Sequence, residues 1–209
     1  MTTWDKIYKN YQQGGAAWAS LAEDIYPQFI KFIQETNFKD KNVLDIGCGT
    51  GNYLKLLQSL GFKTTGIDSS QTAIQMTKKL LADDSKIEYA DMFKYQIAKN
   101  KYDLIISIAS LHHGLKTNIQ KLVNQIYDSL LEGGNTFITV PDYASSKKWN
   151  TFKNNTKISE GTYTPNSGPE KGLPHSFYTK TEIEKLFSQF QNIKLELDKI
   201  GYWFITVKK

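Results

Sequence analysis

The stretch VLDIGCGTGNYLKLL, residues 43–57, determines the expected fold of this chain. Its apolar start ends at Asp45, glycines follow at positions 47, 49 and 51, and apolar residues with helical spacing come next. A strand, a glycine-rich turn and a helix in this order are the usual frame for binding a nucleotide, because closely spaced glycines let the backbone approach the ligand. The chemistry of that ligand depends on the residues around the glycines.

The glycine loop differs from phosphate-binding loops in its third glycine and in the acid before it. A dinucleotide-binding loop has that glycine one position later, where this chain has Asn52, and the Gly-Lys-Ser/Thr run of a P-loop is absent. The Asp45 carboxylate would repel a phosphate at 4 Å by roughly 1–4 kcal/mol, and it would attract a cation instead. We therefore predict a ligand that places a positively charged group at this loop.

Two further acidic residues follow the next strands of the pattern. Asp68 ends GID (66–68), and an acid at this strand tip typically accepts hydrogen bonds from ribose hydroxyls. In EYADMF (88–93), Asp91 can accept from an adenine amino group, and Met92 can lie against the face of the base. A cation, a ribose and an adenine together describe S-adenosylmethionine.

The rest of the chain alternates between strand and helix patterns. Strands are expected at 41–46, 63–68, 86–90, 102–108 and 135–140, and helices at 51–60, 70–82 and about 117–131. Such alternation indicates a parallel sheet that is covered on both faces. The tail differs, because NIKLELDKI and YWFITVKK meet at Gly201 without room for a crossover helix and must pair antiparallel.

Two segments stand outside this alternation. Residues 1–36 have a helical pattern that is interrupted at Gly14-Gly15 and Pro27, and residues 141–178 are rich in Pro, Gly, Ser, Thr and Asn. A long stretch without regular structure is usually a functional or disordered loop. We predict a single domain over 1–209. Its parts are a helical cap (1–36), a cofactor-binding core (37–140), a substrate-side lid (141–178), and a last helix with an antiparallel strand pair (179–209).

The motif set VLDIGCGTGNY, GIDSS, YADMF, YDLIISIASLHH and LLEGGNTFITV resembles the class I S-adenosylmethionine-dependent methyltransferases. The similarity is greatest to the small, single-domain group called type 11 or type 25. It implies an α/β, Rossmann-like, doubly wound sheet of seven strands, mostly parallel with an antiparallel last strand. It also implies a cofactor site along the carboxyl ends of the first, second and fourth strands.

The resemblance assigns a role to each matching residue. Near the methionine part it places the acid Asp45 and the loop residues Gly47, Cys48 and Gly49. The ribose is assigned to Asp68 and Ser69, the adenine to Asp91 and Met92, and backbone contacts to Ser107 and Ile108. The N-terminal segment is expected to close over the cofactor through its aromatic residues Trp4, Tyr8, Tyr11 and Trp18. Several of these residues have a simpler alternative: Asp45 as a turn cap, Cys48 as a small packed residue, Asp68 as a helix cap, Asp91 as a loop acid, and Met92 as core. The N-terminal segment could likewise be a helix that merely packs on the sheet.

Methyl transfer requires little machinery, because a sulfonium is already a strong methyl donor. The enzyme aligns the acceptor and excludes water, and it needs a base only if the acceptor holds a proton near neutral pH. The chain has three histidines, and all are expected near the mouth of the site. We predict His113 and His175 as catalytic candidates. His112 and Asp142 are weaker candidates, and each histidine has a packed, structural alternative.

Composition limits the possible partners. Nothing approaches an apolar run of roughly 18 residues, and the N-terminus lacks the features of a secretory signal, so we expect a cytoplasmic protein without a membrane span. One cysteine excludes an internal disulfide and a cysteine-rich zinc site, and no metal site is predicted. The net charge of +5 comes with lysine and no arginine, which weighs against sequence-specific nucleic-acid recognition.

The predicted function is therefore transfer of a methyl group from S-adenosylmethionine to a small-molecule acceptor by a monomer or homodimer. The alternatives are an RNA or protein side-chain methyltransferase and a non-catalytic S-adenosylmethionine-binding protein. The residues after the fourth strand, SIASLHH, lack the proline pair of DNA amino methyltransferases. The lid, with Tyr143, Trp149 and Phe152 among lysines, is expected to form the acceptor side, where its aromatic rings either stack on a planar acceptor or merely pack. The sequence identifies neither the acceptor nor the atom methylated.

Overall fold

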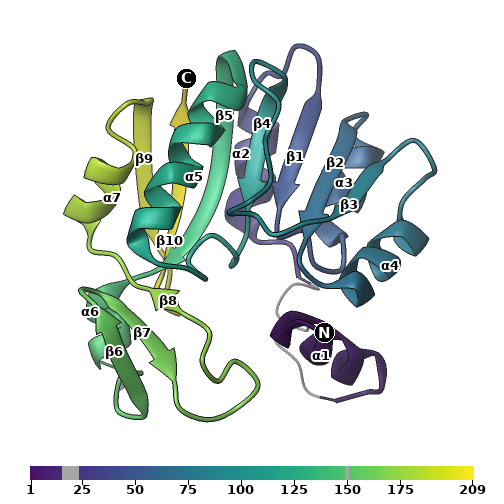
Figure 1. The fold of residues 1–209 in the computed structure, drawn as a ribbon. Coiled ribbons are helices and arrows are strands. Elements are labelled where there is room, and N and C mark those ends of the chain that lie inside the picture. The colour runs from purple at the N-terminus through teal and green to yellow at the C-terminus, as the bar shows by residue number, and fades with distance from the viewer. Residues whose placement is uncertain (16–23, 149–150) are drawn as a thin grey trace.

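The computed structural model describes residues 1–15, 24–148 and 151–209. Trp18 and Trp149, which were expected to line the cofactor and acceptor sites, lie outside the described residues. A seven-stranded sheet with the order β3-β2-β1-β4-β5-β10-β9 forms the centre of the molecule (Figure 1).

Five strands of this sheet are parallel, and the chain reverses at its end as predicted. The parallel strands are β1 (Asn42–Ile46), β2 (Lys63–Asp68), β3 (Lys86–Tyr89), β4 (Tyr102–Ser107) and β5 (Leu130–Pro141). Strand β10 (Tyr202–Lys208) pairs antiparallel with both β5 and β9 (Gln191–Leu197). The predicted Rossmann-like, mostly parallel sheet is therefore confirmed, although β5 begins earlier than expected and the helix before it ends at Ser129.

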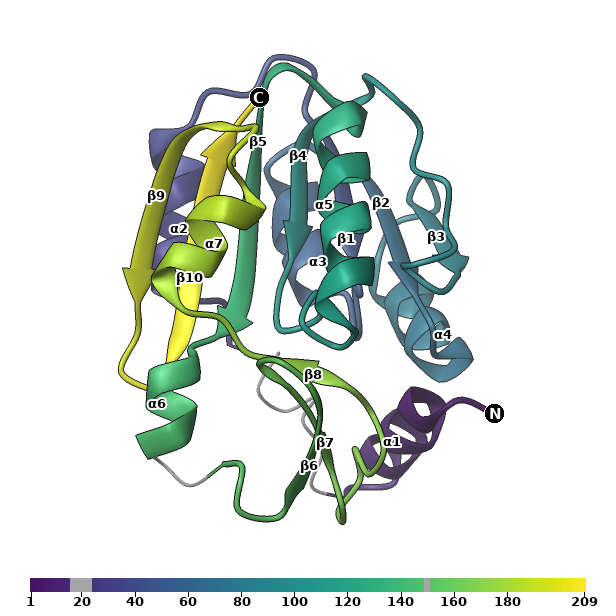
Figure 2. The ribbon, with the colours of Figure 1, turned by 60° about the vertical axis from the view of Figure 1, so that its left-hand side comes forward.

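Helices cover both faces of the sheet (Figures 1 and 2). One face carries α2 (Pro27–Glu35), α3 (Asn52–Ser59) and α4 (Gln71–Leu80), and the other carries α5 (Lys116–Ser129) and α7 (Lys180–Leu186). The continuous apolar run of β4 follows from this arrangement. Leu104 and Ile106 belong to the buried cluster under α2 and α3, whereas Ile105 belongs to the cluster under α5 and α7.

The prediction that residues 141–178 lack regular structure is wrong. After the short helix α6 (Tyr143–Lys148), three strands form a small antiparallel sheet: β6 (Asn155–Ser159), β7 (Thr162–Pro165) and β8 (His175–Ser176). Phe152 stacks on Tyr163 with ring centroids 4.1 Å apart and lies 4.9 Å from Phe177. Tyr143 lies 5.4 Å from the same ring. These rings pack on one another, which agrees with the packing alternative.

The small sheet and helix α1 (Thr3–Gln12) lie at the same end of the central sheet, where the parallel strands end (Figures 1 and 2). This is the end at which open α/β sheets bind their ligands. None of the helices in the described part of the chain is both long and apolar enough to span a membrane. The glycine loop, Asp45 and Asp68 thus lie at this end of the sheet, while Asp91 and Met92 follow β3 nearer to its edge.

Candidate active site

The glycine loop between β1 and α3 has a conformation and surroundings that require glycine. Gly49 and Gly51 have φ angles of 53° and 87°, in the left-handed region that side chains disfavour. A Cβ atom on Gly49 would lie 2.6 Å from the Tyr8 hydroxyl, and one on Gly51 would lie 2.7 Å from the Thr77 methyl. The loop is also fixed internally, because the Thr77 hydroxyl donates to the Gly49 carbonyl at 2.7 Å.

Asp68 connects the end of β2 to this loop. Its carboxylate accepts hydrogen bonds from the backbone N–H groups of Gly49, at 3.0 Å, and Ser70, at 2.8 Å. Burial raises the pKa of Asp68 to about 6, although the N–H groups of Ser70, Gly49 and Ser69 partly offset it. Asp68 therefore orders the glycine loop from the end of β2, whereas the side chain that caps α4 is that of Ser70. The ribose role of Asp68 stays a prediction.

Asp45 is the second buried acid at the loop. It is only 3% exposed, and burial, followed by the charge of Asp68, raises its pKa well above the usual range. Tyr8 of α1 is close enough to both acids that, after burial, the charges of Asp68, Cys48 and Asp45 raise the pKa of its hydroxyl. Burial thus disfavours the ionised form of both carboxyls, and the charge of Asp68 adds to this at Asp45. A cation bound beside them would favour ionisation instead, which is the charge predicted for the ligand.

Helix α1 is held over this site by Asp5, a residue that the sequence analysis did not identify. One oxygen of Asp5 accepts from the backbone N–H and the hydroxyl of Thr72, both at 2.9 Å, and from the Ser70 hydroxyl at 3.2 Å. Burial alone would raise the pKa of Asp5, but these hydrogen bonds lower it to about 2. The Thr2 hydroxyl adds a bond to the Ser69 carbonyl at 2.9 Å. No sequence signal links positions so far apart.

We expect Asp5→Ala to weaken the attachment of α1 to the rest of the protein by about 1–3 kcal/mol, because the buried donors of Ser70 and Thr72 lose their acceptor. The free energy of unfolding should fall by a similar amount if α1 unfolds together with the rest of the protein. Hydrogen exchange of residues 3–12 and thermal melting would measure this loss, with Lys6→Ala, an exposed change on the same helix, as control. Because the folded-state pKa lies below the usual 3.8, this contribution is present above that pH and is lost as the pH falls toward 2. Equal protection of α1 in both variants would contradict the anchoring role.

Cys48 and Ser107 have structural contacts in addition to their places at the site. Cys48 is buried, and its sulfur lies 3.0 Å from where a Cβ on Gly66 would be. Burial raises the pKa of the thiol well above its usual range, which fits a small packed residue and not a nucleophile. The Ser107 hydroxyl donates to the Ile46 carbonyl at 2.9 Å and joins β4 to β1.

The residues assigned to the adenine lie at the edge of the site. Asp91 is exposed, and its carboxylate accepts from the Phe93 N–H at 2.9 Å and lies 3.5 Å from the Lys94 ammonium. Met92 packs partly buried against the core under α5, and Ile108 against the core under α3. Tyr11 packs beside Ile7 on α1.

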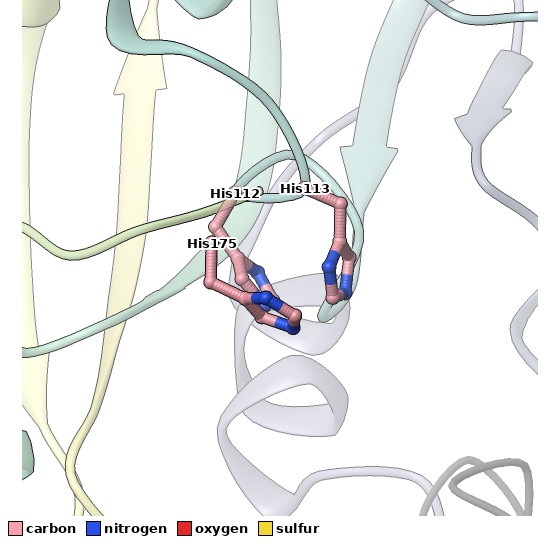
Figure 3. A group of neighbouring side chains, drawn as sticks. All are labelled: His112, His113 and His175. Carbon is pink, nitrogen blue, oxygen red and sulfur yellow. The ribbon is translucent and has the colours of Figure 1, made fainter. Parts of the chain in front are cut away.

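All three histidines converge on one point, as Figure 3 shows. The His113 ring lies 4.0 Å from that of His112 and 4.6 Å from that of His175, and Trp4 of α1 lies against it at 4.6 Å. Burial, followed by neighbouring histidine charges, lowers the pKa values of His112 and His113 well below 6.5. The three histidines, predicted near the mouth of the site, are thus direct neighbours, and His112, the weaker candidate, is part of the same group. The catalytic role of His113 and His175 stays a prediction.

Both carboxylate oxygens of Asp142 take part in hydrogen bonds within the protein. One carboxylate oxygen accepts from the Trp203 indole N–H at 2.9 Å, and the other accepts from the Ser145 N–H at 2.7 Å at the start of α6. The residue is buried. These hydrogen bonds give Asp142 a structural role, because they join α6 to β10.

Comparison with known proteins agrees with this geometry. A family model described as a methyltransferase domain matches residues 18–193. The probable tRNA methyltransferase 9B of Bos taurus is 24% identical over 186 residues, which are 81% of this chain and 39% of that protein. A ubiquinone biosynthesis O-methyltransferase of Nitrosococcus oceani is 30% identical over 95 residues, which are 43% of this chain and 40% of that protein. The matched part is thus less than half of either relative.

Among solved structures, the PH0226 protein from Pyrococcus horikoshii OT3 superposes with a TM-score of 0.77, covering 100% of this chain and 99% of that one at 17% sequence identity. At that identity the likeness shows the fold. The family model, in contrast, spans most of the chain, including the glycine loop and the three strand tips that follow it. The chain therefore belongs to the methyltransferase domain family, and its sheet has the fold expected for the class I group of that family.

Proposed function

We propose that this enzyme transfers the methyl group of S-adenosylmethionine to a small-molecule acceptor. The observation that carries the cofactor part of the proposal is the pair of buried acids at the glycine loop, because a sulfonium or ammonium group would compensate their charge without a phosphate. On the acceptor side, the small sheet and α1 bound the site, and the aromatic rings at 143, 152 and 163 pack on one another. The absence of arginine, on which nucleic-acid recognition relies heavily, favours a small acceptor over a nucleic-acid polymer.

The cofactor assignments follow the strand tips. We propose that Asp45 faces the methionine ammonium, that Asp68 accepts from the ribose hydroxyls, and that Asp91 accepts from the adenine amino group. The carboxylate of Asp91 is exposed and can turn toward a base. The remaining proposed cofactor contacts are Gly47, Cys48, Gly49, Ser69, Met92, Ser107, Ile108 and Tyr11.

The reaction consists of one displacement. The acceptor atom forms a bond to the methyl carbon while the sulfur–methyl bond breaks, and S-adenosylhomocysteine leaves with the electron pair. If the acceptor holds a proton, a neutral histidine on the acceptor side can take it. We propose His113 and His175 for this role. Their rings lie 4.6 Å apart, and His113 follows the carboxyl end of β4, where the cofactor is proposed to bind.

An RNA acceptor is the second candidate, favoured by the similarity to a protein named as a probable tRNA methyltransferase. Purified enzyme incubated with methyl-labelled donor, a metabolite extract and total tRNA distinguishes the two. We expect label in the low-molecular-mass fraction and background counts in tRNA. An Asp68→Asn variant, in which one buried N–H loses its acceptor, is the matched low-activity control. Label that accumulates in tRNA at physiological salt would replace the small-molecule proposal.

A further inference from the structure

The histidine cluster is a group of side chains that methyl transfer itself does not require. His112 and His113 follow β4, and His175 begins β8, so two segments far apart in the sequence supply it (Figure 3). One ligand atom from each ring lies within 4.8 Å of the others. These are all the histidines of the chain. We propose that His112, His113 and His175 bind a divalent transition-metal ion, with zinc as the best match.

The ring nitrogens of the cluster support a cation. The Nδ1 atoms of His112 and His113 are buried and have no hydrogen-bond partner within the ranges that the structure describes. A buried polar atom without a partner is costly, and such atoms call for an explanation such as a bound ion. Neutral imidazole with a free lone pair is the form that binds metals. The unpaired Nδ1 atoms of His112 and His113 are therefore able to bind a metal ion.

His175 has the partners typical of a metal-binding histidine. Its Nδ1 lies 3.0 Å from the Leu173 carbonyl oxygen, and its Nε2 lies 2.9 Å from a carboxylate oxygen of Glu170. Both partners accept hydrogen bonds, whereas a neutral ring has only one N–H to donate. An ion bound at Nε2 would resolve this conflict. The single ring proton could then sit on Nδ1 and be donated to the Leu173 carbonyl, which is the usual arrangement of a metal-binding histidine. Glu170 would then be placed to supply a fourth ligand.

The required movement is confined to side chains. Zinc–nitrogen bonds of 2.0–2.1 Å in a tetrahedral site place the ligand atoms about 3.3 Å apart, so the rings must turn inward. The backbones are already joined, since the Ser176 N–H donates to the His112 carbonyl at 2.8 Å and its hydroxyl donates to the Gly114 carbonyl at 2.7 Å. Three imidazoles and a carboxylate favour zinc and similar ions, whereas magnesium and calcium prefer oxygen ligands alone.

The position of the cluster gives the ion a consequence for the acceptor. The His113 N–H donates to the Ser110 carbonyl, and the Ser110 hydroxyl donates at 3.2 Å to the Gly47 carbonyl of the cofactor loop. An acceptor hydroxyl or thiol bound to an ion here would lose its proton more readily. The ion would use the lone pairs that a histidine base needs, so the metal role and the base role exclude each other.

Zinc titration of the enzyme without a histidine tag tests the proposal. We expect one equivalent to bind, and cobalt to give the intense visible bands of a tetrahedral nitrogen site. Glu170→Gln should weaken zinc binding about 10- to 100-fold, and His175→Ala should weaken it further. Glu160→Gln, a matched change at an exposed acid paired with Lys157, should have no effect.

Zinc binding of equal strength in the parent and in folded His175→Ala overturns the proposal, as does a near-ultraviolet cobalt–thiolate band, which would place the ion at Cys48. If His175→Ala does not fold, the comparison of Glu170→Gln with Glu160→Gln still decides, since unchanged affinity in both also overturns it. The readout needs neither cofactor nor acceptor. A negative result therefore leaves the proposed methyl transfer untouched, and a positive one does not depend on it.

Discussion

The Asp68→Ala variant will bind S-adenosylmethionine and S-adenosylhomocysteine about 5- to 150-fold more weakly, which corresponds to about 1–3 kcal/mol. The change removes the acceptor proposed for the ribose hydroxyls. It also leaves the N–H groups of Gly49 and Ser70, which Asp68 binds at 3.0 and 2.8 Å, without a partner beneath the cofactor. Isothermal titration calorimetry measures the affinity.

Folding will also respond, contrary to what a residue at a strand tip suggests. Asp68 is only 8% exposed, so its loss leaves buried donors unpaired and should lower the melting temperature of the cofactor-free protein. The matched control is Asp128→Ala, which removes an acid from an exposed pair with Lys99 and should change neither quantity. Unchanged affinity in a folded Asp68→Ala variant would reject the ribose assignment.

Cofactor affinity will fall about tenfold between pH 7 and pH 5. In the cofactor-free protein, burial raises the pKa of Asp68 to about 6, so the residue holds a proton at the lower pH. A cationic cofactor and its ribose hydroxyls favour the ionised carboxylate, and binding must first remove that proton. Calorimetry across this pH range measures the slope, and a flat profile would contradict the raised pKa or the contact.

In the cofactor-free protein, Asp68 will give the free energy of unfolding the opposite dependence on pH. Its folded-state pKa lies above the usual 3.8, so between the two values the native state binds more protons than the unfolded state. The contribution of Asp68 to the free energy of unfolding therefore decreases as the pH rises from about 4 to about 6. In Asp68→Asn both trends should weaken, and any slope that remains in the binding curve would belong to Asp45.

The fold was predictable because its decisive signals are local. The glycines after Asp45 specify the turn, and apolar runs such as Tyr102–Ser107 report burial on both faces. Gly201 leaves so few residues between its flanking strands that only antiparallel pairing is possible. Each of these inferences needs no knowledge of what lies opposite in space.

The small sheet could not be predicted, because its strands lack the usual pattern. Four of the five residues of β6 (NTKIS) are exposed, so the strand shows no alternation of apolar and polar side chains, and β8 has only two residues. Asp5 was missed, and the meeting of His175 with His113 was not predicted, for a related reason. Their partners lie 67 and 62 positions away, respectively Thr72 and His113, and such contacts exist only after the chain has folded.

The docking of α1 has a consequence for the time course of catalysis. In the proposed binding mode, a cofactor between Asp45, Asp68 and the glycine loop would lie beneath Tyr8, whose helix is tied to α4 through Asp5. Spent S-adenosylhomocysteine would then have to leave past this helix before new donor enters. The residence time of the product, and with it the maximum turnover rate, should therefore depend on how often α1 detaches. The Asp5 carboxylate, which does not touch the reacting atoms, would then determine the turnover rate.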